Sequence, residues 1–577
     1  MNNNMASCEV FESFSGLGLS TRGKTSCRLE NFRVLADGSL EKREGIRQLA
    51  SLPEPVRGVY SFFDGDEEVI LAVCGNCLYQ ISRDGEILSS PCFSTSEGEV
   101  GSFVHGGRLY FLDGTEAYRY EGKGCAIRVH GYTPLYGKNW CTYRTDDHFL
   151  NEPINCFSPH IRIHFLVVSS TKLLSIGFCV ESVDWVMANG VMIDPSKYSL
   201  TEAKNHVSFT ESIYTSEMEI SVTISESLYR DADFCSCRSA AVYEGFANSR
   251  AFFYGGKKNG QFFVSKRLDP KEAERDQALF SDSCGLYFPK GESLSVGSGQ
   301  PITAVHRMLD RMLIFFPSSL WASEPLNEVE GDGILFSPIC GHLGCSSSQA
   351  VVMTGASSPI SVAHSGVYLW EIDPDLLSEC VVRCISKEML PVLEGRFFAN
   401  AGICHHRKRG ELWFYDADGG DGRILLYSLD RKTWYCYSGV LADRLFAFDG
   451  GVGFVKGDKL CIFDEDLCTD RFFDGEEKIS ALFESGWLDF DGAGTDKRLE
   501  ALVLTADLSV GELSASLFDG KLLGEEKIFE ADAVASGIYE RRVPTGRFRA
   551  AKLRLCACGP MRERIYRVEL LAQKGKK

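Results

Sequence analysis

The feature that most constrains the fold of this chain is a strand–turn–strand unit that recurs along most of its length. In each copy an apolar strand runs into a turn of Gly, Asn or Asp, and a second strand rich in aromatic residues follows. Seven copies can be distinguished, at residues 69–81, 107–120, 249–265, 310–322, 360–370, 411–427 and 452–463. A pure β pattern that repeats every ~40–50 residues is typical of propeller blades. We therefore expect an all-β chain built on a β-propeller of six to eight blades.

The turns and the composition agree with this expectation. Gly75-Asn76 and Asp113-Gly114 lie between apolar strands, and such pairs favour tight β-hairpins. The chain contains 56 Gly and 38 Phe but only 18 Pro, which suits many short aromatic strands joined by glycine turns. Helical periodicity is scarce, and residues 270–279 are the clearest short helix.

Two stretches differ from the repeats and predict separate modules. A chain of 577 residues is too long for one core. Residues 133–238 alternate as in a small β-sandwich, with an Asn189-Gly190 hairpin turn, and lie between the second and third copies. Residues 476–577 alternate again. We therefore expect an N-terminal arm at 1–25, a propeller at 26–132 and 239–475, an inserted β-sandwich at 133–238 and a C-terminal β-sandwich at 476–577.

The charge balance disfavours a nucleic-acid-reading surface. Asp and Glu number 79 against 61 Lys and Arg, which gives a formal net charge of −18. A general phosphate-binding surface is difficult to build from such a chain. Residues 1–11 have neither a basic start nor an apolar stretch, so no signal peptide is expected. The most apolar stretch, 164–183, contains polar and charged residues, and we expect no membrane insertion.

The cysteines and acidic loops offer only weak metal-site candidates. The 22 cysteines are expected to stay mostly as buried thiols. Cys74 and Cys77 form a CxxC pair that zinc could use, yet no matching pair exists and Gly75-Asn76 between them favours a hairpin. The carboxylates of Asp416, Asp418 and Asp421 could hold calcium, but the segment is also a typical solvated turn. We predict no metal site and no cofactor.

Catalytic motifs are equally weak. The nucleophile elbow GxSxG, usable phosphate loops and HExxH are all missing from the sequence. Residues 428–434 narrowly miss the sialidase-type turn, and the basic run 405–409 is more typical of an exposed turn than of a phosphate clamp. Seven tryptophans could stack on sugars or fill the core, namely Trp140, Trp185, Trp321, Trp370, Trp413, Trp434 and Trp487. We predict no catalytic residues and no enzyme activity.

Several landmarks occur in the order found in tailed-bacteriophage propeller proteins. The opening segment 31–45 resembles the pattern N-x-R-…-G-x-L-x-K-R-x-G that precedes the first blade in that family. Segments 253–270, 301–315 and 366–369 are similar to later blade signatures, and 484–497 resembles the start of the C-terminal sandwich. At positions 256–257 this chain has Gly-Lys where the family often has Asn-Pro. Glu41, Lys42 and Arg43 are interpreted as an exposed edge or a partner surface.

The resemblance implies a virion structural protein of the stabilisation, nozzle or tail-tube type, without catalytic residues. It predicts a chain made in the bacterial cytoplasm that forms a homo-oligomeric ring at the head–tail junction (the neck) or in the tail. Its partners would be copies of itself and portal, adaptor or other tail proteins, and genomic DNA would pass an acidic wall without sequence-specific contact. Two alternatives stay open, a carbohydrate-binding or carbohydrate-cleaving host-recognition propeller and a cellular kelch-like adaptor.

Overall fold

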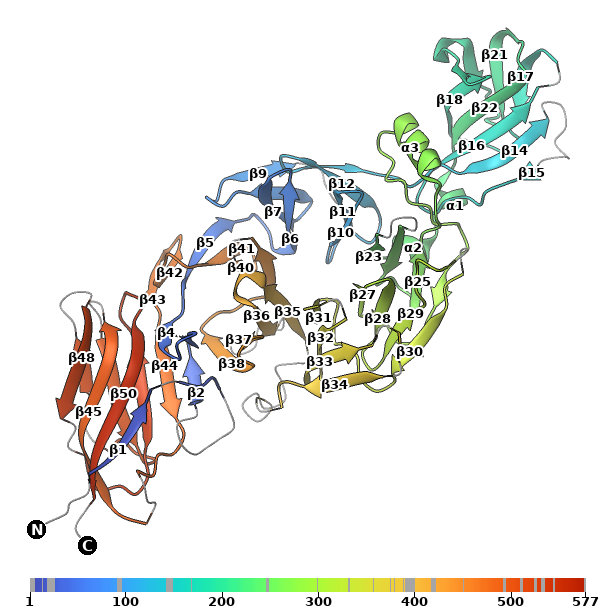
Figure 1. The fold of residues 1–577 in the computed structure, drawn as a ribbon. Helices are drawn as coiled ribbons and strands as arrows, with labels where there is room; N and C mark the ends of the chain where they lie inside the picture. Colours follow the sequence, from blue (N-terminus) through green and yellow to red (C-terminus); the bar gives the residue numbers. More distant parts are fainter. Residues whose placement is uncertain are drawn as a thin grey trace, which may run out of the picture. The chain divides into compact units, whose positions relative to one another are not determined.

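The structure is a computed structural model, and its regular secondary structure consists mainly of β-strands (Figure 1). It describes residues 6–574 apart from 13, 18–25, 91–95, 142–148, 168, 245–248, 298, 330–332, 356, 374, 378, 388, 390–399, 417–421, 450, 491–493, 509–511, 524–526, 531–534 and 543–544. The chain divides into two compact units. Unit 1 comprises residues 1–75, 79–88 and 344–577, and unit 2 comprises residues 76–78 and 89–343.

Seven sheets follow one another along the chain. Five of them have four strands, and each of the other two contains a set of four strands as part of a larger sheet. They are the blades of a β-propeller, with an inserted and a C-terminal β-sandwich, which confirms the expected fold class. Each of the seven sequence copies forms the middle hairpin of one blade. Strands in the middle of a blade are buried on both faces, as β32 (Pro359–Ala363) illustrates, because neighbouring blades cover both sides of a sheet.

Unit 2 holds three blades, and their innermost strands β10, β23 and β27 lie side by side. The first consists of β10 (Gly101–His105), β11 (Arg108–Leu112), β12 (Ala117–Gly122) and β13 (Cys125–Arg128). The second consists of β23 (Ser239–Tyr243), β24 (Arg250–Tyr254), β25 (Gln261–Val264) and β26 (Leu294–Ser295). The third consists of β27 (Ala304–Met308), β28 (Arg311–Phe315), β29 (Leu320–Ser323) and β30 (Phe336–Cys340).

The inserted sandwich of unit 2 has its own two sheets. The larger one runs in the order β15-β14-β16-β22-β18-β19 and the smaller one in the order β17-β21-β20. Their bounds are β14 (Leu135–Cys141), β15 (Phe149–Leu150), β16 (His160–Leu166), β17 (Thr171–Ser175), β18 (Ser182–Ala188), β19 (Val191–Met192), β20 (Tyr198–Leu200), β21 (His206–Ile213) and β22 (Glu217–Thr223). These strands pair with one another in the described residues and not with a blade strand.

Short helical segments complete the two units. In unit 2, α1 (Glu226–Tyr229) and α2 (Ala232–Cys235) lead out of the insert, and η1 (Pro195–Lys197) lies within it. The expected helix at 270–279 is α3 (Pro270–Leu279), which begins where the side chain of Asp269 accepts a hydrogen bond from Lys271 N. In unit 1, η2 (Arg407–Arg409) links two blade strands.

Unit 1 holds four blades. Their strands are β6 (Val56–Asp64), β7 (Glu67–Cys74), β8 (Cys77–Ile81) and β9 (Ile87–Ser90); β31 (Val351–Met353), β32, β33 (Gly366–Ile372) and β34 (Cys380–Cys384); β35 (Ala401–His406), β36 (Glu411–Asp416), β37 (Arg423–Ser428) and β38 (Thr433–Ser438); and β39 (Arg444–Phe448), β40 (Gly451–Lys456) and β41 (Lys459–Asp464). The last blade takes its fourth strand, β5 (Gly45–Ser51), from the start of the chain. The two ends of the propeller sequence are therefore joined within one sheet.

The C-terminal sandwich also recruits strands from the N-terminal region. Its strands are β44 (Ala481–Ser485), β45 (Lys497–Leu508), β46 (Glu512–Phe518), β47 (Lys527–Glu530), β48 (Ala535–Arg542), β49 (Lys552–Ala557) and β50 (Arg564–Lys574). β1 (Ala6–Phe11) and β4 (Leu40–Lys42) pair with β50, β3 (Phe32–Val34) pairs with β4, and β2 (Ser26–Glu30) pairs with β44. The hairpin of β42 (Thr469–Phe472) and β43 (Gly475–Lys478) extends the β5 sheet. The structure thus differs from the expected division, which placed residues 26–44 in the propeller and 1–25 in a separate arm.

Gly101 at the start of β10 has no room for a side chain, because a Cβ there would overlap the carbonyl oxygen of Arg238. We expect Gly101→Ala to destabilise unit 2 by about 1–3 kcal/mol through a forced backbone shift. Urea unfolding followed by tryptophan fluorescence measures this effect. Gly341→Ala is the matched control, because its Cβ would meet open space. Equal unfolding midpoints for the two variants would contradict the close approach.

Candidate functional site

The CxxC pair lies at a hairpin turn. Cys74 ends β7 and Cys77 begins β8, with Gly75 in the left-handed region at a φ of 53°. The thiol of Cys74 lies 2.9 Å from the carbonyl oxygen of Glu54, so it is engaged by backbone rather than by a second cysteine pair. Among the residues that the structure describes, no group of three or more His, Cys, Asp and Glu side chains could hold a metal ion.

The other sequence candidates lie in different surroundings. Asp416 ends β36, and the rest of the acidic loop, Asp418 and Asp421 included, lies outside the described residues. The basic run 405–409 turns the chain between β35 and β36, where Arg409 forms ion pairs with Glu44 and Glu465 instead of facing an open phosphate site. Five tryptophans are buried, Trp321 is half-buried and Trp487 is exposed over Lys552. Most tryptophans therefore fill the core.

The charged residues of the opening motif are buried, which corrects the expectation that they form an exposed edge. Lys42 and Arg43 are 0% and 2% exposed, and Glu44 is 3% exposed. Burial of these charges is tolerated because each has a partner: Lys42 Nζ lies 2.7 Å from Glu563 Oε2 in the C-terminal sandwich. Only Glu41, the middle residue of β4, is half-buried.

These residues form a junction network within unit 1, which we define as Asn31, Arg33, Arg43, Glu44, Arg409, Glu411, Tyr437 and Asp470. Arg43 binds the carboxylate of Asp470 through two parallel hydrogen bonds of 2.9 and 2.7 Å. Glu44 lies 2.9 Å from Arg409 and 3.8 Å from Arg33, and Arg33 also pairs with Glu411. The network thus joins the segment before β5 to strands of the last two blades.

Asn31 extends this network to the C-terminal sandwich. It adopts a left-handed φ of 56°, and its amide donates to Ser480 O at 2.8 Å and to Ser438 Oγ at 3.1 Å. Its side-chain oxygen accepts from Ser438 N and from Arg43 Nε. The sheet is also continuous here, because β2 lies between β38 of a blade and β44 of the sandwich. Blade and sandwich are therefore fixed to each other by covalent, sheet and ionic connections.

The electrostatics of Glu44 show how strongly the network favours its charged form. Burial by itself raises the pKa of the Glu44 carboxyl, but Arg409 and Arg33 more than offset this, and the pKa falls from its ordinary 4.5 to about 2. Burial and the adjacent Glu44 charge raise the pKa of Tyr437 well above its ordinary value, so the phenol stays protonated. The charged residues of the opening segment 31–45 therefore hold a blade and the C-terminal sandwich together.

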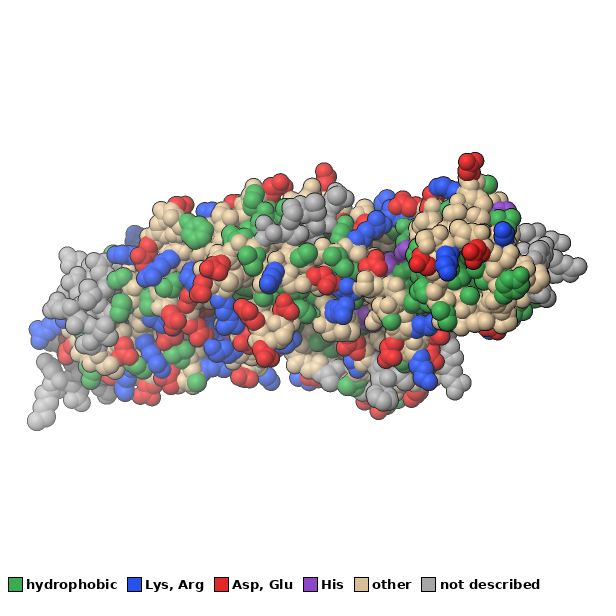
Figure 2. Space-filling model, turned by 90° about the horizontal axis from the view of Figure 1, so that it is seen from above, with side chains coloured by type: hydrophobic (Ala, Val, Ile, Leu, Met, Phe, Trp, Pro, Cys, Tyr) green, Lys and Arg blue, Asp and Glu red, His purple; other side chains and the backbone are tan. Residues whose placement is uncertain are grey.

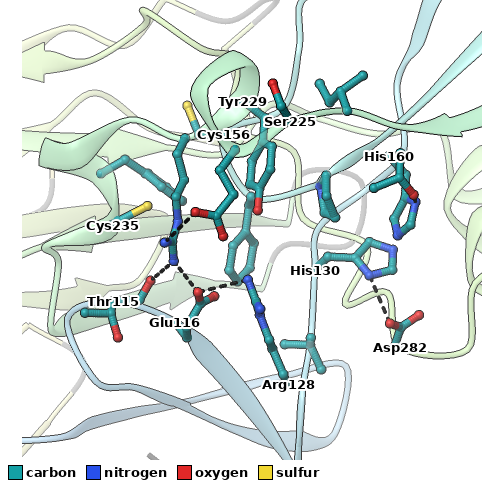
Figure 3. A pocket seen from close by; sticks show the side chains of 18 of the residues that line it. Thr115, Glu116, Arg128, His130, Cys156, His160, Ser225, Tyr229, Cys235 and Asp282 are labelled. Carbon is teal, nitrogen blue, oxygen red and sulfur yellow. Dashed lines mark hydrogen bonds and ion pairs between the residues drawn. The ribbon is translucent and has the colours of Figure 1, made fainter. Parts of the chain in front are cut away.

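A second feature is a cavity of about 530 Å3 in unit 2, where the insert joins the blades (Figure 3). Its apolar part is lined by Phe234 and Phe253 of the blade core cluster and by Phe157, which packs against that cluster. On one side, Glu116 at the end of the β11–β12 turn binds Arg128 at 2.9 Å and also pairs with Arg230. Burial raises the pKa of Glu116 and these two arginines only partly oppose it.

Two imidazoles lie on the other side of the cavity. The rings of His130 and His160 meet edge to face with centroids 4.7 Å apart, and Phe280 packs against both. His130 Nδ1 lies 3.3 Å from Asp282 Oδ2, and His160 Nδ1 lies 2.9 Å from Asp184 Oδ2. The hydrogen bond from His130 lowers the pKa of Asp282. In Figure 3, His130 and Asp282 lie on one side of Arg128 and Glu116 lies on the other.

Three thiols line the same cavity. Burial raises the pKa of Cys156 and of Cys237 to about 12, and it also raises the pKa of Cys235. They are therefore protonated and poorly nucleophilic at neutral pH. None of the cavity residues was a sequence candidate. A sequence reading could have noted only that Arg128, His130, Glu226 and Arg230 lie near the two positions at which the chain passes between the blades and the insert.

The comparisons with known proteins show only distant likeness. No family model matches the chain, and no curated protein matches it. Among solved structures, the WD40 domain of SCAP from fission yeast has 9% identity and a TM-score of 0.32, and covers 75% of this chain and 97% of its own. A glycoside hydrolase family 43 arabinoxylan arabinofuranohydrolase from Bacillus subtilis has 10% identity and a TM-score of 0.23, over 78% of this chain and 96% of its own. Kluyveromyces lactis Hsv2 has 10% identity and a TM-score of 0.25, over 67% and 97%.

Proposed function

We propose that the chain is a non-enzymatic structural protein of a tailed-bacteriophage virion, which assembles with copies of itself into a ring at the head–tail junction or in the tail. The virion assignment rests on the ordered motifs of residues 31–497 that resemble phage propeller proteins. The observation that carries assembly is an exposed apolar tip on the inserted sandwich. We name it the distal tip and define it as Leu166, Val191, Met192 and Tyr214.

The strand register places the distal tip at the end of the insert away from the blades. In the antiparallel pair of β16 and β22, His160 lies opposite Thr223 at the blade end, and Leu166 lies opposite Glu217 at the far end. Strands of seven residues separate these ends by about 20 Å. Figure 1 shows the insert extending away from α1 and α3. Val191 and Tyr214 are 70% and 83% exposed there.

The distal tip is held rigidly, which lowers the entropic cost of binding. Asn189 in the β18–β19 turn has a left-handed φ of 45°, and its side-chain oxygen accepts hydrogen bonds from Thr215 Oγ1, Ser216 Oγ and Glu217 N. This cross-link ties the turn before Val191 to the loop after Tyr214. Tyrosine is one of the residues that most often anchor protein interfaces, and Tyr214 is 83% exposed. The partner we propose is the neighbouring copy in the ring.

The charge distribution supports only part of the expectation of an acidic wall. The face in Figure 2 shows acidic and basic side chains interspersed, with no acidic field on that face. The formal charge of −18 still supports a ring that does not bind DNA tightly. Among the described residues no helix is long and apolar enough to cross a membrane.

We expect the double substitution Val191→Ser and Tyr214→Ser to abolish ring formation, because it removes the two most exposed anchors of the distal tip. Mass photometry and negative-stain microscopy of the purified full chain provide the measurement. Phe63→Ser is the matched control, because Phe63 is an exposed aromatic side chain on blade strand β6. Rings that persist in the double variant, or a wild-type chain that stays monomeric at high concentration, would overturn the proposal.

A further inference from the structure

The helix α3 belongs to the second blade of unit 2 but contacts the inserted sandwich. It lies in the connection between β25 and β26, and Figure 1 shows it beside the strands of the insert. Within the described residues 270–279, only Asp276 is buried. Apolar burial by the helix itself is therefore small, and its attachment to the insert depends mainly on polar and charged side chains.

Four of these side chains form a closed cycle of alternating charge, which we name the strap quartet and define as Arg162, Glu219, Glu272 and Arg275. Arg275 Nη2 donates to both carboxylate oxygens of Glu219, at 2.9 and 3.1 Å. Arg162 Nη1 lies 3.3 Å from Glu219 Oε1, and its Nη2 lies 3.3 Å from Glu272 Oε2. Glu272 and Arg275, three positions apart on α3, close the cycle at 4.0 Å. The helix and the insert thus contribute two members each.

The two halves of the strap quartet differ in burial. The side chains of Arg162 and Glu219 on the insert are 4% and 17% exposed, whereas those of Glu272 and Arg275 on the helix are 45% and 41% exposed. Arg162 also donates to Thr133 O, at 3.1 Å, in the segment that leads into the insert. The buried pair therefore keeps its own partners when the helix members lose their charge, and no buried charge is left alone.

The strap quartet grips the insert beyond the point where the chain enters it. At the base of the insert, Phe280 directly after the helix packs on His160 with ring centroids 4.9 Å apart. In the pair of β16 and β22, Glu219 lies opposite His164, four residues farther along β16 than His160. Four strand residues span about 13 Å. A contact at this distance from the base resists tilting of the insert more strongly than a contact at the base.

We propose that α3 is a strap that fixes the angle between the inserted sandwich and the blades of unit 2, with the strap quartet as its fastening. Glu272 and Arg275 act as positioning residues. Without their charges the insert tilts about the segments at its base, and even a small tilt displaces the distal tip, about 20 Å from the base, by several ångströms. The strap operates within a single chain, so the proposal holds whether or not copies assemble into a ring.

The test measures the angle as the distance between one label on the insert and one on a blade of the same unit. Glu211 on β21 and Arg108 on β11 are exposed and are replaced by p-acetylphenylalanine, whose ketone takes a nitroxide label without reaction at the native thiols. Pulsed electron double resonance then gives the distance distribution in the purified full chain. A single narrow distribution is expected when α3 is unaltered. A broad distribution in this chain would overturn the proposal.

The variant that releases the strap is Glu272→Gln combined with Arg275→Gln. It removes one charge of each sign and leaves the two members on the insert paired with each other. Its distance distribution is expected to be at least about twofold wider, because the insert is then free to move about its base. Lys271→Gln combined with Glu274→Gln is the matched control, since both residues are exposed on the same helix at the same spacing. An unchanged width in the release variant, or equal widening in the control, would overturn the strap.

Discussion

Glu44→Ala is expected to lower the free energy of unfolding by about 3–5 kcal/mol, the largest effect of any single substitution that we predict. The reason is that Glu44 is buried between Arg33 and Arg409, and its removal takes one of two carboxylate partners from each guanidinium, leaving Glu411 for Arg33 and Glu465 for Arg409. Urea unfolding of the full chain measures the loss. The matched control is Glu477→Ala on the exposed strand β43, which should change stability by less than about 0.5 kcal/mol.

The same carboxylate predicts a pH dependence. The folded-state pKa of Glu44, about 2, lies below its ordinary value of 4.5, so its stabilisation is complete above about pH 4.5 and is lost as the pH falls toward 2. Glu44→Gln removes this titrating group. The stability of the variant should therefore decline less steeply between pH 4.5 and pH 2 than that of the wild type. Parallel acid profiles for the two proteins would show that Glu44 is not held as a buried anion.

Removing the inserted sandwich is expected to abolish ring assembly while the blades stay folded. Deletion of all of residues 133–238 is too coarse, because Cys156, Phe157, Phe234 and Cys237 within that range pack in the blade core with Phe253. The strand pairing indicates a narrower deletion that leaves the blade core intact. Leu135 and Glu152 are hydrogen-bonded neighbours, and His160 lies opposite Thr223. The chain segments that flank each deletion are therefore already neighbours. Short glycine links can replace residues 136–151 and 161–222 and so remove the sandwich.

The expected product is a monomer with folded blades, as measured by mass photometry and by a cooperative thermal transition. Its far-ultraviolet circular dichroism should still be that of a β-protein. The control is the full chain carrying only a glycine insertion in the exposed Gly106-Gly107 turn of a blade, which does not belong to the insert. If the excised variant still closed into rings, the interfaces would lie on the blades or on the C-terminal sandwich. The role that we assign to the insert would then be refuted.

The blades could be predicted from the sequence because their signals are local. A hairpin such as 107–120 contains its own apolar strands and its own Asp113-Gly114 turn, and Gly114 takes the positive φ that this turn requires. The insert could be predicted for the same reason, since Asn189-Gly190 and the alternation of β22 are visible in single segments. The repeat period and the residues of each turn can be recognised without knowing which distant residues they contact.

The junction network could not be predicted, because its pairs join residues hundreds of positions apart. Arg43 and Asp470 are separated by 427 positions, and a charged Glu-Lys-Arg run looks like an exposed edge until its partners are known. The sequence pattern assigns residues 26–44 to the propeller for the same reason, since the pairing of β4 with β50 and of β2 with β44 is non-local. The cavity depends on two chain crossings that meet only in the folded protein, so His130 and His160 carried no signal in the sequence.

A cryo-electron microscopy map of the intact phage particle tests the central claim most directly. The account predicts density for the propeller with its projecting inserted sandwich, repeated around the particle axis at the neck or tail, with the distal tip seated on the neighbouring copy. Density for the chain absent from the particle, or present only as isolated copies away from the axis without a neighbour at the insert, would contradict it.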